Sequence, residues 1–177
     1  RWPGVIEDET VDPERLQAES LGLADIVLKD FLATRGREGD KLAAMILDRV
    51  ARMRELTAQV APLLPLSIAD YETRLSAKLR DAVANLDEER IRQEIGLFAT
   101  RIDVAEELSR LSTHLDELER IVKKGGAVGK RLDFLMQELN REANTLASKS
   151  VSAEITAIAL EQKLLIEQVR EQVQNLE

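Results

Sequence analysis

Carboxylates and an imidazole occur at helical spacing between residues 103 and 114. Asp103 and Glu107 are four residues apart, so on a helix they lie one turn apart and can share a cation, with Glu106 beside them. Carboxylate oxygens and imidazole nitrogens suit Mn²⁺ or Mg²⁺. His114 is the single histidine of the chain, and histidines titrate near neutral pH, so it is a candidate general acid or base for attack on a phosphodiester.

This spacing has a second interpretation that the residues alone leave open. His114 is almost two turns beyond Glu107, so on one straight helix it cannot bind the same ion without ligands from another helix. Glu107, Arg110 and His114 also fit a salt-bridged helix face, in which neighbouring turns pair with each other. In that case His114 is a hydrogen-bonded histidine in a helix groove.

A second group of polar side chains lies between residues 133 and 144: Asp133, Glu138, Arg141, Glu142 and Asn144. The glutamates can bind a metal ion, and a guanidinium can hold a phosphate through two parallel hydrogen bonds. The alternative is a polar network between helices at a subunit interface, which is compatible with an active site between subunits.

A third group is basic and flanks the sequence Gly-Gly-Ala-Val-Gly; it consists of Arg120, Lys123, Lys124, Lys130 and Arg131. Backbone amides of a glycine-rich turn together with cations can cradle a phosphate. Cations also stabilise the last turn of any helix, so ordinary helix capping is an equally good interpretation.

Aromatic residues that could stack on nucleic-acid bases are few and scattered: Trp2, Phe31, Tyr71, Phe98 and Phe134. Stacking therefore receives no support from the sequence. If RNA binds, we expect its backbone and shape to be recognised.

The elements that position these groups are two amphipathic helices joined by a glycine turn, within residues 101–150. Apolar residues recur at intervals of three and four, which predicts one buried stripe on each helix. The first stripe is Val104, Leu108, Leu111, Leu115, Leu118 and Val122, and the second is Leu132, Leu135, Met136, Leu139, Ala143 and Leu146. The glycines at 125, 126 and 129 predict the turn between them.

The preceding residues predict one long helix. Asp12-Pro13-Glu14 is a good helix start, with a capping carboxylate and proline at the first helical position. The apolar phase continues through Gly36 and Gly39, so we expect a single helix to about residue 60, with a kink near Gly36 as the alternative. Pro62 and Pro65 are predicted to end it.

Further helices are predicted on both sides of the central pair. Ser67 with Asp70 resembles a capping pair for a helix to about residue 86. Asp87 is predicted to cap the next helix, and Ser150 or Ser152 to begin the last one. No segment has the alternation of a strand, so we predict an all-α fold of long antiparallel helices or extended helical hairpins.

The amino-acid composition bears on which partners the chain can bind. Apolar residues make up 44% and aromatic residues 3%, and the net charge is −8. The acidic balance by itself argues against a nucleic-acid partner, because affinity for a polyanion comes largely from Lys and Arg. Charge segregation, or metal ions on the carboxylates, would weaken that objection. There is no cysteine, no apolar run long enough to span a membrane and no visible signal peptide, so the chain is expected to be cytoplasmic.

Three blocks resemble one known family in order: RIDVAEELSRL followed by His114, then VGKRLDFLMQELNREANTLASKS, then IEQVREQVQNLE. They are similar to the C-terminal region of the bacterial YicC/YloC family, and the resemblance covers roughly residues 90–177. It implies a metal-dependent endoribonuclease that favours Mn²⁺ and forms a hexamer. The opening Arg1-Trp2-Pro3-Gly4-Val5 resembles the segment after the family's N-terminal domain, which the resemblance implies is missing.

These considerations give a working assignment. Residues 1–11 are predicted to be a linker, residues 12–86 a helical arm and residues 87–177 the C-terminal domain with the family motifs. The expected function is metal-assisted hydrolysis of RNA by a homo-oligomer, and the alternative is a non-catalytic helical scaffold or an adaptor for RNA or a nuclease. Predicted catalytic residues are His114, Glu107 and Glu138. Predicted metal ligands are Asp103, Glu106, Glu107, Glu138 and Glu142. Predicted RNA-binding residues are Arg110, Lys123, Lys124, Lys130, Arg131, Arg141 and Lys149.

Overall fold

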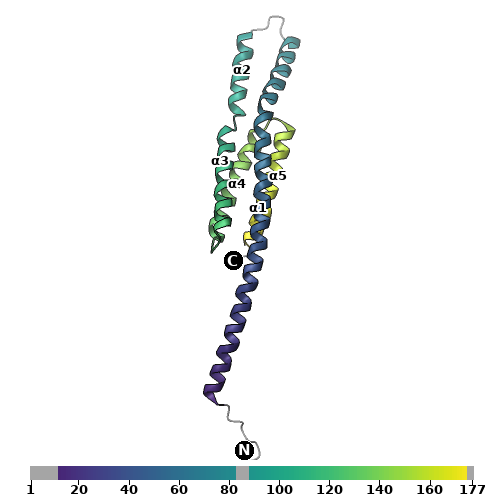
Figure 1. Ribbon diagram of the computed structural model, residues 1–177. Coiled ribbons are helices and arrows are strands. Elements are labelled where there is room, and N and C mark those ends of the chain that lie inside the picture. Colours follow the sequence, from purple (N-terminus) through teal and green to yellow (C-terminus); the bar gives the residue numbers. More distant parts are fainter. Residues whose placement is uncertain (1–11, 83–87, 175–177) are drawn as a thin grey trace, which may run out of the picture. The chain divides into compact units, whose positions relative to one another are not determined.

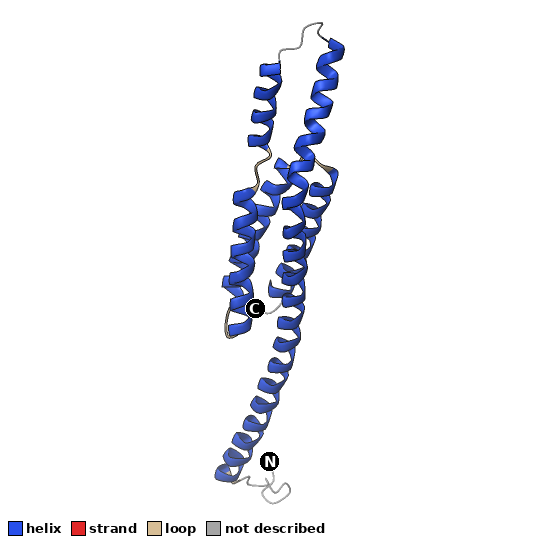
Figure 2. Ribbon diagram, turned by 45° about the horizontal axis from the view of Figure 1, so that its top comes forward, coloured by secondary structure: helices blue, strands red, loops and turns tan. Residues whose placement is uncertain are grey.

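The computed structural model describes residues 12–82 and 88–174 and confirms the all-α fold. These residues form five helices: α1 (Pro13–Ala82), α2 (Glu88–Arg101), α3 (Ala105–Lys124), α4 (Gly129–Lys149) and α5 (Ala153–Gln174) (Figure 1). The described residues contain no strand (Figure 2). The chain divides into two compact units, residues 1–42 and residues 43–177. The predicted linker, arm and C-terminal domain stay predictions.

The first unit contains the beginning of α1. Asp12 Oδ1 accepts a hydrogen bond from the Glu14 amide at 3.0 Å, which confirms the predicted helix start. The helix continues through Gly36 and Gly39, as predicted. The apolar side chains of this unit are exposed rather than buried: Leu16, Leu21, Leu23, Ile26, Val27, Leu28, Phe31 and Leu32.

The predicted helix end at Pro62 and Pro65 is wrong, because α1 continues through both prolines to Ala82. Proline removes a backbone donor and normally kinks or ends a helix. Here the residues on both sides of the prolines are packed, since Val60 and Ser67 are both buried. This packing opposes a kink or an end of the helix at the prolines. Ser67 is therefore not a helix cap, and its hydroxyl instead donates to the Leu63 carbonyl at 3.0 Å.

In the second unit, the part of α1 from Ala43 onward packs with α3, α4 and α5 around one apolar core. Contacts show that neighbouring helices are antiparallel: Arg49 and Arg52 of α1 reach Gln168 and Glu161 of α5, respectively. The core side chains with the largest volumes are Ile46, Met53, Leu56, Leu111, Leu115, Leu118, Met136, Leu139, Leu146, Ile155 and Ile166. This is the packing of an antiparallel helical bundle.

Helices α3 and α4 form the predicted hairpin. Gly125 and Gly126 have φ values of 67° and 96°, a left-handed region that glycine adopts without a steric penalty. All six predicted apolar residues of α4 are buried. On α3 the prediction is partly confirmed, because Leu108 and Val122 are half-buried and Ile121 is buried in addition.

The helix ends on either side of the hairpin are made by short polar side chains. Before α3, which begins at Ala105, Asp103 Oδ1 accepts from the Ala105 amide at 3.0 Å in a local side-chain turn. Ser152 Oγ accepts from the Ile155 amide at 3.1 Å, which makes Ser152 the residue that caps α5. The predicted cap at Asp87 lies outside the described residues. Within the described part of the chain, no helix combines the length and the apolar character needed to cross a membrane.

Candidate functional site

Polar contacts between α3 and α4 lie along one edge of their apolar seam. From one end to the other, Lys149 pairs with Glu107, Arg110 with Glu142, and Arg131 with Glu117. His114 lies between the last two pairs, opposite Glu138. Each contact joins a residue of α3 to a residue of α4, because the two helices are antiparallel and each carries a polar stripe beside its buried stripe.

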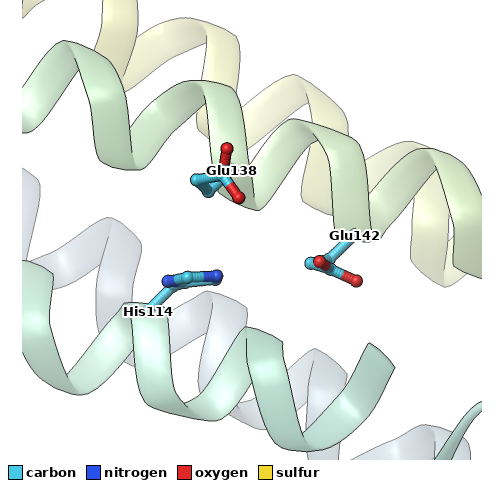
Figure 3. Close-up of side chains that lie close together, drawn as sticks. All are labelled: His114, Glu138 and Glu142. Atoms are coloured by element: carbon cyan, nitrogen blue, oxygen red, sulfur yellow. The ribbon is translucent and has the colours of Figure 1, made fainter. Parts of the chain in front are cut away.

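His114, Glu138 and Glu142 form the candidate site. Each offers a ligand atom, an imidazole nitrogen or a carboxylate oxygen, and these atoms all lie within 4.8 Å of one another. Figure 3 shows the imidazole reaching from α3 toward the two carboxylates of α4. His114 and Glu138 are half-buried and Glu142 is buried, so the group opens to solvent on one side. Two carboxylates and one imidazole are a donor set that suits Mn²⁺ or Mg²⁺.

Glu142 is the most buried carboxylate of the group, with 3% of its surface exposed. Among the described residues it accepts one hydrogen bond, which Arg110 Nη1 donates to Oε1 at 3.3 Å, a long distance for such a bond. Arg110 also pairs with Glu106 on its own helix. Hydrogen bonds from Arg110 to Glu106 and Glu142 raise the pKa of the guanidinium, so it stays cationic. The guanidinium therefore lies between two carboxylates, and only one of them belongs to the cluster.

The other predicted metal ligands lie outside this group. Asp103 Oδ1 accepts from the Ala105 amide just before α3, and Glu106 pairs with Arg110. Glu107 is buried, and its Oε1 pairs with Lys149 Nζ at 2.9 Å, while Lys149 also donates to the Asp103 carbonyl at 2.8 Å. Lys149 thus ties the start of α3 to the end of α4. Glu107 Oε2 is buried and accepts no hydrogen bond from the described residues.

Several of the predicted RNA-binding cations are engaged by carboxylates. Arg131 hydrogen-bonds to Glu117 across the turn, Arg120 hydrogen-bonds to Glu117 within α3, and Lys123 Nζ lies 2.6 Å from Glu119 Oε1. Hydrogen bonds and charge from Arg120, followed by Arg131, lower the pKa of Glu117 to about 2. The turn is therefore held by ion pairs, which agrees with the capping interpretation.

The remaining predicted cations, Lys124, Lys130 and Arg141, are exposed. Arg141 lies three residues after Glu138, on the same face of α4. Among the described residues, the ion pairs of the α3–α4 edge do not include it. Asn144 is exposed as well, while Asp133 Oδ2 accepts from Gln137 and Asp133 Oδ1 lies 3.6 Å from Arg170 Nε.

The sequence-based assignment placed ligands from residues 103–107 and residues 138–142 at one site with His114, whereas the structure brings together only His114, Glu138 and Glu142. A signal for this was present. His114 and Glu138 are each 12 residues from Gly126, and Arg110 and Glu142 are each 16 residues from it. In a tight antiparallel hairpin, residues equidistant from the turn lie opposite each other, so the pairing can be read from the glycine position.

The described residues form a helical bundle in which two antiparallel helices bring a histidine and two carboxylates together. The family model described as "Endoribonuclease YicC-like, C-terminal" matches residues 60–177. The chain therefore belongs to the YicC-like family.

Two relatives carry the printed name "Probable endoribonuclease YicC". The protein from Haemophilus influenzae is 51% identical over 177 residues, which is 100% of this chain and 62% of that protein. The protein from Clostridioides difficile is 31% identical over 175 residues, which is 97% of this chain and 60% of that protein. The chain thus spans about three fifths of the length of these relatives.

Proposed function

We propose that the chain is the metal-binding and catalytic part of an endoribonuclease that hydrolyses RNA. The observation that carries the proposal is the cluster of His114, Glu138 and Glu142, whose ligand atoms converge within 4.8 Å from two helices. The names of the two relatives and of the family support the reaction class. The donor set supports a divalent cation, and we propose Mn²⁺.

The residues fit such an ion in two respects. The Glu142 carboxylate is buried and, within the part of the chain that the structure describes, accepts one long hydrogen bond, from Arg110, and a buried carboxylate with so little compensation gains from a second cation. The cluster is also half-open to solvent at His114 and Glu138, so substrate can reach it. When bound, a divalent cation polarises phosphoryl oxygens and activates water for attack on a phosphodiester.

The chain's own groups then have separate roles. His114, Glu138 and Glu142 hold the cation. Arg110 keeps Glu142 in place, and its guanidinium carries positive charge that favours an approaching phosphate. Arg141 is exposed beside Glu138 and is placed to bind a phosphate bidentately. The acid–base role predicted for His114 and the catalytic role predicted for Glu107 stay predictions.

A non-catalytic adaptor is the competing function, and one observation favours it. Arg110, Lys123, Arg131 and Lys149 are all paired with carboxylates, which leaves fewer cations for a long RNA. The predicted homo-oligomer and cytoplasmic location are compatible with either function and stay proposals.

Turnover separates the two functions. The full-length protein, given RNA in tenfold excess with Mn²⁺, is expected to cleave all of it, and EDTA is expected to stop the reaction. His114→Ala and Glu138→Gln should each lower the rate by two or more orders of magnitude, a usual cost for removing a catalytic group. Glu171→Gln, an exposed position on α5, is the matched control and should cleave normally. Stoichiometric RNA binding without cleavage would establish the adaptor function instead.

A further inference from the structure

Phe134 is an exposed aromatic side chain beside the candidate site. The structure describes three aromatic residues in residues 43–177. Tyr71 and Phe98 stack on each other, with ring centroids 3.6 Å apart and planes 8° apart, so one face of each ring is covered by the other. Phe134 instead has 58% of its surface exposed. The scattered aromatic residues of the sequence therefore include one ring that is free to stack.

The position of Phe134 on α4 relates it to the cluster. It precedes Glu138 by four residues, one helical turn, and Arg141 follows Glu138 by three. Residues at these spacings are neighbours on one helix face. The face thus carries an aromatic ring, a candidate metal ligand and a guanidinium in order, over about 10 Å at 1.5 Å per residue.

This order matches the parts of a nucleotide chain. An aromatic ring stacks on a base, carboxylates that hold a cation bring that cation to a phosphate, and a guanidinium binds a further phosphate. Bases inside a duplex already have neighbours on both faces, so a side chain can stack only on an unpaired base. A single exposed apolar residue is common on protein surfaces, and the position beside Glu138 is what distinguishes Phe134 from Leu160 or Leu164 of α5.

We propose that Phe134 stacks on an unpaired base of single-stranded RNA and so places the adjacent phosphate at the cluster of His114, Glu138 and Glu142. Arg141 holds the neighbouring phosphate. Phe134 is a positioning residue, and the preferred substrate class is single-stranded RNA. This inference rests on the proposed endoribonuclease function, and it adds the substrate class and the residue that selects it.

The test compares Phe134→Ala, Phe134→Leu and Phe134→Trp in the full-length protein, with Leu164→Ala as control because Leu164 is also 58% exposed. RNA binding is measured in EDTA, where no metal-dependent cleavage occurs, and cleavage is measured with Mn²⁺. Phe134→Ala is expected to weaken single-strand binding and raise KM about tenfold, with kcat changed little, because stacking on one base contributes about that much. Phe134→Leu should behave like Phe134→Ala, while Phe134→Trp should retain wild-type binding, because it keeps an aromatic ring at this position.

An oligonucleotide series with one abasic position identifies the stacked base. Wild-type protein should lose about tenfold in affinity at one position, and Phe134→Ala should lose nothing further there, because the two changes remove the same interaction. The inference would be overturned if the affinity losses from the abasic position and from Phe134→Ala were additive, or if Phe134→Ala bound RNA like wild type. Cleavage by the wild-type protein would be unaffected by either result, so the proposed function would stand. Stacking by a protein that never cleaves would overturn the proposed function and keep this inference. A change in oligomeric state on Phe134→Ala would assign Phe134 to a contact between copies and also overturn it.

Discussion

Glu142 is the most buried carboxylate among the residues that the structure describes. It is 3% exposed, and the hydrogen bond it accepts among the described residues comes from Arg110 at 3.3 Å. Replacing a buried ion pair by apolar side chains of similar volume is often neutral or stabilising, and the cost of removing one partner comes from the buried charge left behind. Removing Glu142 leaves no buried charge, because Arg110 is half exposed and keeps its pair with Glu106. A protein retains such a residue at that position when its chemistry is needed, which is the expectation for a metal ligand.

Glu142→Met should therefore separate stability from activity. We expect the free energy of unfolding to stay equal or to rise by about 1 kcal/mol, because a desolvated charge is removed, while cleavage is lost. Urea unfolding and the turnover assay measure the two effects. Glu171→Met, at an exposed position of α5, should change neither. A large loss of stability in Glu142→Met would mean that the carboxylate is structural.

Glu117 gives the hairpin a defined pH dependence. Arg120 and Arg131 lower its pKa from 4.5 to about 2. A carboxyl whose pKa is lower in the folded state stabilises that state fully above pH 4.5, and this contribution is lost as the pH falls through about 2. Glu117→Gln should therefore be less stable than wild type at pH 7, and the difference should shrink as the pH approaches 2.

Urea midpoints of the two proteins between pH 7 and pH 2 measure this effect. Arg120→Met should raise the pKa of Glu117, since Arg120 is the main cause of the shift, and NMR titration of the carboxyl carbon reports that pKa directly. A constant difference between wild type and Glu117→Gln over the whole pH range would contradict the ion-pair account of this turn.

At the scale of elements, the two internal prolines of α1 are the clearest departure from sequence rules. Both side chains are exposed, so alanine at these positions loses little packing and regains a backbone donor. Pro62→Ala and Pro65→Ala should each raise the free energy of unfolding by about 1–3 kcal/mol. Pro13→Ala is the control, because proline at the first helical position costs nothing. Equal effects at all three positions would contradict the continuous helix.

The sequence predicts elements well where local chemistry decides them. Three predicted features depend on neighbouring residues alone, and all three are confirmed. They are the helix start at Asp12-Pro13-Glu14, the turn at Gly125 and Gly126 and the apolar stripe of α4. The path of α1 beyond Pro62 depends on packing between helices, which no local rule contains. The site is an intermediate case. Its residue types were visible, and the convergence of His114 with Glu138 follows only when the hairpin register is counted from Gly126.

For the whole molecule, charge pairing limits how RNA can bind. The net charge is −8, and four of the predicted RNA-binding cations are paired with carboxylates. Few phosphate contacts imply a weak salt dependence, since each contact on a single strand contributes about −0.7 to the slope of log K against log salt.

We therefore expect a slope of about −2 for single-stranded RNA, equivalent to about three phosphate contacts. Equilibrium binding at several salt concentrations in EDTA measures it, and Arg141→Ala should make the slope shallower by about one contact. Lys163→Ala is the control, because it removes a cation from a different helix, α5. A slope near −6 would show that an extended basic surface binds RNA, in conflict with the paired cations described above.

The Mn²⁺ concentration that gives half-maximal RNA cleavage tests the central claim most directly. In the full-length protein, Glu142→Asp should raise that concentration by about 10-fold or more and recover activity at high Mn²⁺, because a shorter carboxylate weakens the metal site without removing its charge. Glu171→Asp, exposed on α5, should match wild type. A Glu142→Asp protein that loses activity with an unchanged Mn²⁺ requirement would contradict the assignment of His114, Glu138 and Glu142 as the metal site.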